Sequence, residues 1–152
     1  MTKSTSREII ISKKLIEVNT KKRGRPLIYE SDIDKSLRKL QNSKKELKSI
    51  SFDVFKGWYL LQNNCCGYCG LTNTDAKKLS LLYPNSTRGG KRGFSLELDR
   101  KDSNITDYSI LDNLCLACYW CNNAKTNYFS FEEFKIIGNA IQQIQKHKLL
   151  KP

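Results

Sequence analysis

The first half of the chain carries apolar residues at helical spacing in two stretches. The first begins at Ser31, a good N-cap residue, and its thin apolar stripe runs to residue 50. The second begins at Ser51 and stops at Asn63 and Asn64. The stripe of the first predicted helix consists of Ile33, Leu37, Leu40, Leu47 and Ile50, and the buried positions expected in the second are Phe52, Phe55, Trp58, Tyr59 and Leu61. The first helix is expected to dock on the core, with a dimer contact or a position along DNA as alternatives.

The middle of the chain changes from a loop pattern to a strand pattern. Residues 71–93 are rich in turn-forming and basic residues, which predicts an exposed loop. Residues 94–100 alternate apolar and polar positions, as a half-buried strand does, and residues 112–117 are the predicted partner strand. Residues 119–127 are expected to form a short helix.

The last predicted helix is defined at its start by a capping box. Ser130 is the N-cap, and Glu133 completes the S-x-x-E pattern. The inner face of this helix is expected to consist of Phe131, Phe134, Ile137, Ile141 and Ile144. Helices that flank one two-stranded hairpin predict an α+β fold.

Composition adds a partner to this picture. The formal net charge is +12, from 27 Lys and Arg against 15 Asp and Glu in 152 residues. So large an excess on a small chain favours a polyanion as the partner, with nucleic acid ahead of an anionic membrane. No apolar run approaches the ~20 residues that a membrane span needs. We therefore expect an intracellular protein, in which cysteines bind metal more often than they form disulfides.

The basic residues are dense near the N-terminus. Lys22, Arg23 and Arg25 lie in the run KKRGRP, which resembles the RGRP core of an AT-hook. An extended arm of this kind places arginines in the narrow minor groove of A·T-rich DNA, where the negative potential is concentrated. A plain basic linker is the alternative interpretation of the four residues RGRP.

Two C-x2-C pairs are the strongest chemical signal in the sequence. Cys66 and Cys69 form the first pair, and Cys118 and Cys121 form the second. Two such turns supply four thiolates, which complete a tetrahedral zinc site with Zn–S distances of about 2.3 Å. Four thiolates leave no open position for substrate, so this zinc is predicted to be structural.

The two remaining cysteines do not fit this spacing. Cys65 precedes the first pair directly, and only Cys66 has the right separation from Cys69. Cys115 falls on a predicted strand, where a small buried apolar residue is the simplest interpretation. Neither is expected to bind the metal.

The residues between and after the cysteine pairs resemble the HNH (ββα-metal) endonuclease family. These residues are the strand end LELDR, the DYS turn, the DNL turn and the run LACYWCNNAKTN, and the resemblance covers roughly residues 51–145. Within the family, it is greatest to a restriction endonuclease. Matched position by position, Asp99 takes the place of the family's Asp, Arg100 that of its first His, Asn113 that of its middle Asn and Asn122 that of its final His or Asn.

The resemblance implies a second metal site made of oxygen ligands. Asp99 and Asn122 are expected to bind Mg²⁺ or Mn²⁺, which prefer such ligands and keep other positions for water and phosphate. Asn113 is expected to orient the loop between the strands. Lys125, in the same short helix as Asn122, is a further candidate for contact with DNA.

Arg100 departs from the family pattern. The first His is normally the general base, and a guanidinium does not deprotonate at a useful pH. Arg100 is therefore expected to clamp the scissile phosphate. Tyr68, inside the first cysteine turn, is the first candidate for the base and Tyr59 the second, whereas His147, the only histidine, lies far along the last helix.

Taken together, these patterns predict an arm and helix over residues 1–50 and an HNH nuclease domain over residues 51–152. The expected function is metal-dependent cleavage of double-stranded DNA, in restriction, homing or junction resolution. A symmetric target site would require a homodimer. The main alternative is a non-catalytic zinc protein that binds DNA; an RNA-binding zinc module is disfavoured because the chain has no aromatic pattern of the RRM kind.

Overall fold

The computed structural model of the protein describes residues 31–86 and 92–150. The chain divides into two units, Met1–Asp32 and Ile33–Pro152. Lys22, Arg23 and Arg25 of the basic arm lie outside the described residues. The second unit includes residues 33–50, which the sequence pattern grouped with the arm.

The predicted first helix is two elements. The α-helix α2 spans Asp32–Asn42, and the 3-10 helix η1 spans Glu46–Ser49. Gln41 is buried at the break, where its side-chain amide donates to the carbonyls of Leu47 (3.1 Å) and Ile50 (2.8 Å). These bonds fold the chain back, so Leu47 enters the core while Ile33, expected on the apolar stripe, is 67% exposed.

Helix α3 begins where the sequence predicts and ends earlier. It spans Phe52–Leu60, and its N-cap Ser51 accepts a hydrogen bond from the Val54 amide. Phe55 is fully buried, but Leu61 is exposed. Asn63 and Asn64 then adopt positive φ angles of 52° and 50°, a conformation that asparagine tolerates better than most residues.

The expected loop over residues 71–93 is wrong for its first part, which is helical. Helix α4 spans Asn73–Leu82, and the 3-10 turn η2 spans Pro84–Ser86. Thr72 is the N-cap: its hydroxyl accepts from the Asp75 amide at 3.1 Å and donates to the Asp75 carboxylate at 2.8 Å. Ala76 and Leu79, three residues apart, are buried. The cap and the apolar spacing were both present in the sequence.

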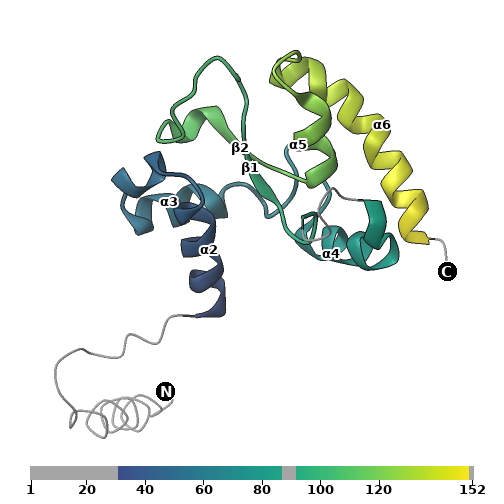
Figure 1. Cartoon of the computed structure of the whole chain (residues 1–152), viewed down its shortest axis with the longest axis horizontal. Coiled ribbons are helices and arrows are strands. Elements are labelled where there is room, and N and C mark those ends of the chain that lie inside the picture. Colours follow the sequence, from purple (N-terminus) through teal and green to yellow (C-terminus); the bar gives the residue numbers. More distant parts are fainter. Residues whose placement is uncertain (1–30, 87–91, 151–152) are drawn as a thin grey trace, which may run out of the picture. The chain divides into compact units, whose positions relative to one another are not determined.

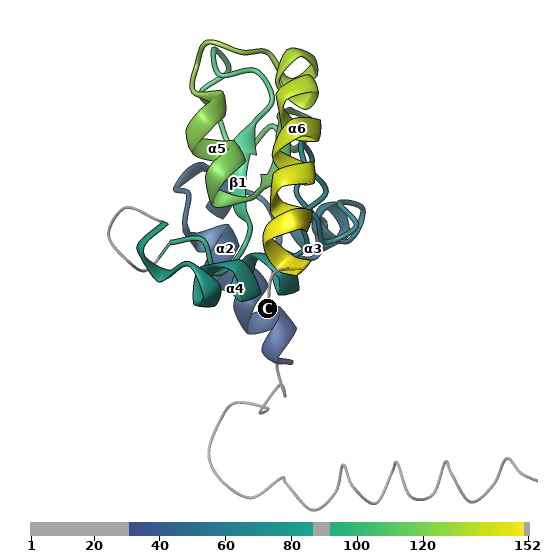
Figure 2. The ribbon, with the colours of Figure 1, turned by 90° about the vertical axis from the view of Figure 1, so that its right-hand side faces the viewer.

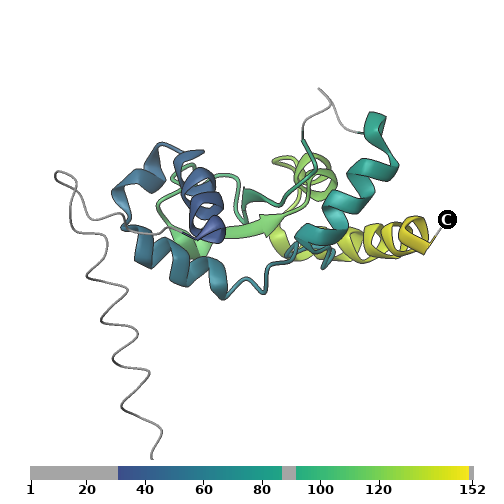
Figure 3. The same ribbon diagram turned by 90° about the horizontal axis from the view of Figure 1, so that it is seen from below.

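The predicted hairpin is confirmed, with shorter strands. Strand β1 (Glu97–Arg100) pairs antiparallel with β2 (Leu114–Ala117), and the 3-10 turn η3 (Leu111–Asn113) leads into β2. All four residues of β2 are buried. Figure 3 shows the hairpin between α2 and α3 on one side and α4, α5 and α6 on the other.

The last two helices lie side by side (Figures 1 and 2), and α4 also contacts α6. Helix α5 spans Tyr119–Lys125 and α6 spans Phe131–Leu150. The capping box of α6 is present, since the Ser130 amide donates to the Glu133 carboxylate at 2.9 Å. None of the described helices combines the length and apolar character of a membrane span.

The buried face of α6 agrees in part with the expected one, since Phe131, Phe134 and Ile141 pack in or against the core as predicted. Phe134, Gly138 and Gln145 are buried, whereas Ile137 and Ile144 are 37% and 58% exposed. Gly138 is buried because α6 packs closely on the turn that carries Cys66 and Cys69. A Cβ on Gly138 would collide with the backbone carbonyl of Tyr68. A glycine and a glutamine thus occupy positions where an apolar stripe would place large aliphatic residues.

Candidate active site

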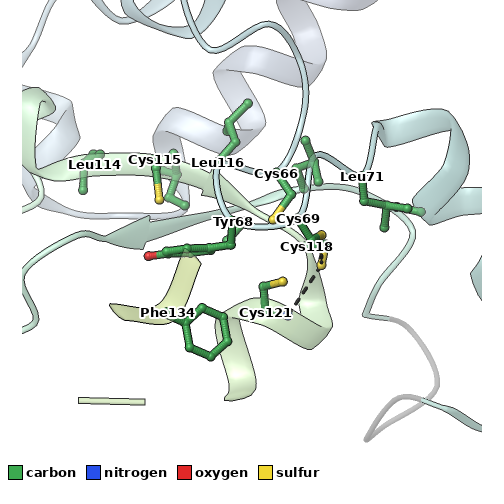
Figure 4. Close-up of a cluster of buried hydrophobic side chains, with 14 of the residues drawn as sticks. Cys66, Tyr68, Cys69, Leu71, Leu114, Cys115, Leu116, Cys118, Cys121 and Phe134 are labelled. Atoms are coloured by element: carbon green, nitrogen blue, oxygen red, sulfur yellow. Dashed lines mark hydrogen bonds between the residues drawn. The ribbon is translucent and has the colours of Figure 1, made fainter. Parts of the chain in front are cut away.

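The four cysteines of the two C-x2-C pairs meet in one buried cluster. Their sulfur atoms all lie within 4.8 Å of one another, and each cysteine is at most 2% exposed. Figure 4 shows them where the turn that carries Cys66 and Cys69 meets the start of α5. Cys118 is the N-cap of α5 and Cys121 lies one turn later, so both project from the same end of that helix.

The geometry of the cluster fits a tetrahedral metal site. A tetrathiolate zinc site with Zn–S bonds of about 2.3 Å has sulfur–sulfur edges of about 3.8 Å. The Sγ atoms of Cys69 and Cys118 are 3.7 Å apart. These four residues can therefore hold a metal ion such as zinc.

The electrostatics of the cluster also favour a cation. Hydrogen bonds from Cys118, Cys121 and Cys69 hold the pKa of Cys66 far below its ordinary value. The contacts with Cys118 raise the pKa of Cys69 and of Cys121, since a second thiolate would lie beside the first. Without a metal, the four thiols therefore cannot all be thiolates at once. A bound divalent cation would offset the repulsion between the thiolates.

Gln145 of α6 contributes to this cluster, a role that no motif in the sequence indicates. Its carbonyl oxygen accepts from the Cys69 thiol at 3.4 Å, and its Nε2 lies 3.8 Å from the Cys118 sulfur. Cys65 and Cys115 are not in the cluster. Cys115 is buried on β2, where burial raises the pKa of its thiol to about 12, in keeping with an unreactive thiol.

Tyr68 connects the cysteine cluster with the strand that carries Asp99. Its backbone lies between Cys66 and Cys69, its ring packs edge-on against Phe134, and its hydroxyl donates to Oδ2 of Asp99 at 2.6 Å. Burial, Cys115 and this hydrogen bond raise the pKa of Tyr68 well above its ordinary value. The phenol is therefore the proton donor in this pair.

A polar surface lies between β1 and α5. Glu97 and Asp99 are two residues apart on β1, so their side chains leave the strand on the same face. From α5, Asn122 Nδ2 donates to Glu97 Oε2 at 2.7 Å, and Lys125 Nζ lies 3.9 Å from Asp99 Oδ2. The structure thus brings Asp99, Tyr68 and the α5 residue Asn122 to one region, next to Glu97, which the sequence analysis did not select.

Lys125 has a different place from the one expected of a DNA contact. It is 1% exposed, and its ammonium group donates to the Arg100 carbonyl at 3.0 Å and to the Ser103 hydroxyl at 3.2 Å. A phosphate outside the protein cannot reach this group. Lys125 instead ties α5 to the end of β1, because burial of an ammonium requires partners of this kind.

Arg100 and Asn113 lie on the loop side of the hairpin. The Arg100 guanidinium donates to the Ile105 carbonyl at 3.4 Å and lies 5.4 Å from the ring centre of Tyr108. Asn113 accepts from the Asp102 amide at 2.9 Å and donates to the Asp102 carbonyl at 3.0 Å. Asn113 therefore holds the loop that leaves β1. Among the described residues, no hydrogen bond joins the Arg100 side chain to the side chain of Asp99 or Asn122.

A basic cleft of about 810 Å³ opens beside Asn122 and Glu97. Its basic lining residues are Lys39, Lys44, Lys77 and Arg92. Among the described residues that line it, Glu97 is the single acidic one. The charge of this cleft suits an anionic polymer.

Among the described residues, neither alternative candidate for the general base forms a hydrogen bond with Asp99. Tyr59 lines the basic cleft, where its hydroxyl donates to Asn64 at 2.7 Å, and burial raises its pKa. His147 lies in the last turn of α6 and is exposed.

The fold has a counterpart among solved structures. The rare-cutting HNH restriction endonuclease PacI is 26% identical, and the alignment covers 86% of this chain and 95% of that chain with a TM-score of 0.56. The chain has the fold of an HNH endonuclease. No protein-family profile matches the sequence, nor does any curated protein.

This likeness confirms two of the predictions made from the sequence. The α+β class with a ββα core is confirmed, and so is the resemblance to the HNH endonucleases that the DR, DNL and CNN motifs indicate. The similarity supports a nuclease-like function for the chain.

Proposed function

We propose that this protein is a metal-dependent DNA endonuclease that hydrolyses phosphodiester bonds beside Asp99 and Asn122. One observation carries this proposal: in an HNH fold, β1 and α5 bring the Asp99 carboxylate and the Asn122 amide to one polar surface next to a basic cleft. PacI is named as an HNH restriction endonuclease, which supports the same reaction class.

The cysteine cluster holds zinc in this proposal. The four sulfurs are buried and occupy every position of a tetrahedral ion, so no water or substrate binds there. Zinc joins the turn of Cys66 and Cys69 to the first turn of α5. It thereby fixes both Tyr68 and Asn122, which project from these two elements toward β1.

Asp99 and Asn122 hold Mg²⁺ or Mn²⁺, since a carboxylate and an amide oxygen suit a hard cation. When bound, this ion polarises the scissile phosphate and stabilises the departing 3′ oxygen. Asp99 is 15% exposed in its side chain, so the region is open to substrate, unlike the cysteine cluster.

Three further residues act around this pair. Arg100 binds the scissile phosphate and the charge that develops on it. Asn113 keeps the loop after β1 in place through its bonds to Asp102. Tyr68 is the candidate for proton transfer, and its raised pKa means that a cation near Asp99 is needed before the phenol can act as a base.

Double-stranded DNA is the proposed substrate and partner. The basic cleft accommodates the sugar–phosphate backbone, and the arm with Lys22, Arg23 and Arg25 adds contacts in a minor groove. Residues 1–50 and 51–152 remain our proposed functional division. Restriction is the first of the proposed biological roles, and homing and junction resolution are the others. A DNA substrate is consistent with a location inside the cell. A symmetric target site would be cut by a homodimer.

A plasmid cleavage assay tests the proposed function. The protein is incubated with supercoiled plasmid and Mg²⁺, Mn²⁺ or EDTA, together with Asp99→Ala and the matched control Asp112→Ala, an exposed aspartate near the same hairpin. We expect cleavage with either metal, none in EDTA and none for Asp99→Ala, while the control cuts normally. DNA binding in EDTA that is never followed by cleavage across metals and target sequences would favour the non-catalytic DNA-binding protein.

A further inference from the structure

The side-chain amide of Asn122 has a partner that sets its orientation. Asn122 Nδ2 donates to Glu97 Oε2 at 2.7 Å. A carboxylate has no proton to donate, so it selects the NH₂ end of the amide and rejects the oxygen end. The Oδ1 atom must then point away from Glu97.

The orientation of this amide matters because only its oxygen binds a hard cation. An amide that turns by about 180° presents NH₂, which carries positive partial charge, to the metal. Asn122 in isolation has no preference strong enough to exclude that rotamer, since its terminal torsion is broad. A fixed acceptor on the opposite side removes the freedom to turn.

Glu97 is itself held in place by Arg92. The guanidinium binds both carboxylate oxygens, Nε to Oε1 at 2.9 Å and Nη2 to Oε2 at 2.6 Å. This two-point contact fixes the plane of the carboxylate. It also offsets the negative charge of Glu97 beside Asp99, two residues on along β1.

We propose that Glu97 is a positioning residue that orients Asn122 so that its oxygen, together with Asp99, faces the catalytic metal. This inference rests on the proposed function. Glu97 acts through Asn122 in this proposal, because its Oε2 accepts the hydrogen bond from Asn122 Nδ2. Outer hydrogen-bond partners of metal ligands typically contribute roughly 10- to 100-fold to metal affinity.

A swap of the two groups tests the orientation directly. Glu97→Gln has nearly the same shape but accepts and donates, so it no longer selects one end of the amide. Asn122→Asp in the native background places two carboxylates against each other. In the double variant Glu97→Gln, Asn122→Asp, the glutamine donates to the new carboxylate, whose other oxygen faces the metal.

The first measurement is Mn²⁺ affinity by titration calorimetry without DNA. Glu97→Gln should bind Mn²⁺ roughly 10-fold more weakly than the native protein, and the double variant should bind it more tightly than either single variant. Arg92→Ala is the control because it removes the ion pair and leaves the Glu97–Asn122 bond. It should weaken Mn²⁺ binding less than Glu97→Gln does. The second measurement is the NMR shift of the Asn122 side-chain amide in the metal-free protein, which should move toward the solvent-exposed value in Glu97→Ala.

The outcomes separate this inference from the proposed function. If the native protein binds Mn²⁺ and Glu97→Gln binds it equally well, Glu97 does not position Asn122. A double variant no better than the single ones, with Arg92→Ala equally impaired, would mean that Glu97 only anchors the Arg92 segment. A native protein that binds no Mn²⁺ would overturn the proposed function and this inference together.

Discussion

The cysteine cluster and the surface between β1 and α5 share one short helix, yet they have opposite properties. Cys118 and Cys121 at the start of α5 are fully buried in the cluster of four sulfurs, whereas Asn122, the next residue, donates to the partly exposed side chain of Glu97. The helical rotation of about 100° per residue separates the two. A closed site is suited to holding the fold together, and an open site with oxygen donors is suited to chemistry.

Tyr68 lies between these two regions and belongs to both. Its backbone is part of the cysteine turn, and its hydroxyl donates to Asp99. A change in the cluster should therefore reach the Asp99 region through Tyr68 and α5, whereas a change at Asp99 should leave the cluster intact. This asymmetry leads to the following predictions.

The largest effect is expected from removing a ligand of the closed site. Cys118→Ser should abolish cooperative thermal unfolding, because structural zinc contributes on the order of 10 kcal/mol, comparable with the whole stability of a domain. Cys65→Ser, outside the cluster, is the control and should keep its metal and its melting temperature. Metal analysis and calorimetry check both variants; a folded, metal-free Cys118→Ser protein would contradict the role of the cluster.

Tyr68→Phe removes the hydroxyl by which the cysteine turn bonds to Asp99. If the phenol accepts the proton, turnover should fall by roughly 10²- to 10⁴-fold while the ring still packs on Phe134. Its pKa is raised, so the active phenolate becomes more abundant as pH increases. The native rate should therefore rise with pH through the neutral range, by up to about 10-fold per pH unit, and the variant should lose this dependence.

The pH profile of Tyr68→Phe decides between two interpretations. A variant with nearly native turnover and an unchanged pH profile would mean that Tyr68 only packs against the cysteine turn. Metal content and the melting temperature should stay close to native in either case, because the ring and the backbone are retained.

Arg100→Ala tests the open region without touching the closed one. Turnover should fall by roughly 10²- to 10³-fold, because a clamp acts mainly on transition-state charge. Affinity for DNA in EDTA should change much less. Arg100→His is the matched variant, since it restores the residue type that the HNH family has at this position. Equal losses of affinity and turnover would make Arg100 a general DNA contact instead.

The smallest effect is expected from Gly138→Ala, which acts on the backbone beneath Tyr68. The new methyl group collides with the Tyr68 carbonyl, and overpacking of this kind costs about 1–3 kcal/mol. Gly57→Ala is the control, because a Cβ at that position of α3 has no neighbour within 4 Å. Chemical denaturation should separate the two; equal stabilities would show that α6 shifts to accommodate the methyl group.

The sequence by itself determined the features that depend on local spacing. Two C-x2-C turns can bring four thiolates to one metal, and the structure places those four sulfurs together. The capping box at Ser130, the cap at Ser51 and the alternation of β1 are equally local, and each element begins or pairs as predicted. The HNH resemblance rests on short motifs of the same kind.

Only the tertiary structure decided which face of each helix or strand is buried and which distant residues form hydrogen bonds with one another. Helix α4 was missed although its cap and spacing were legible, because the glycine-rich residues after it dominated the prediction. Lys125 looked like a surface cation until the pairing of α5 with β1 buried it. Glu97 and Gln145 were unremarkable polar residues in the sequence. Their partners lie far away in the chain, and a hydrogen bond between distant residues leaves no periodic signal along it.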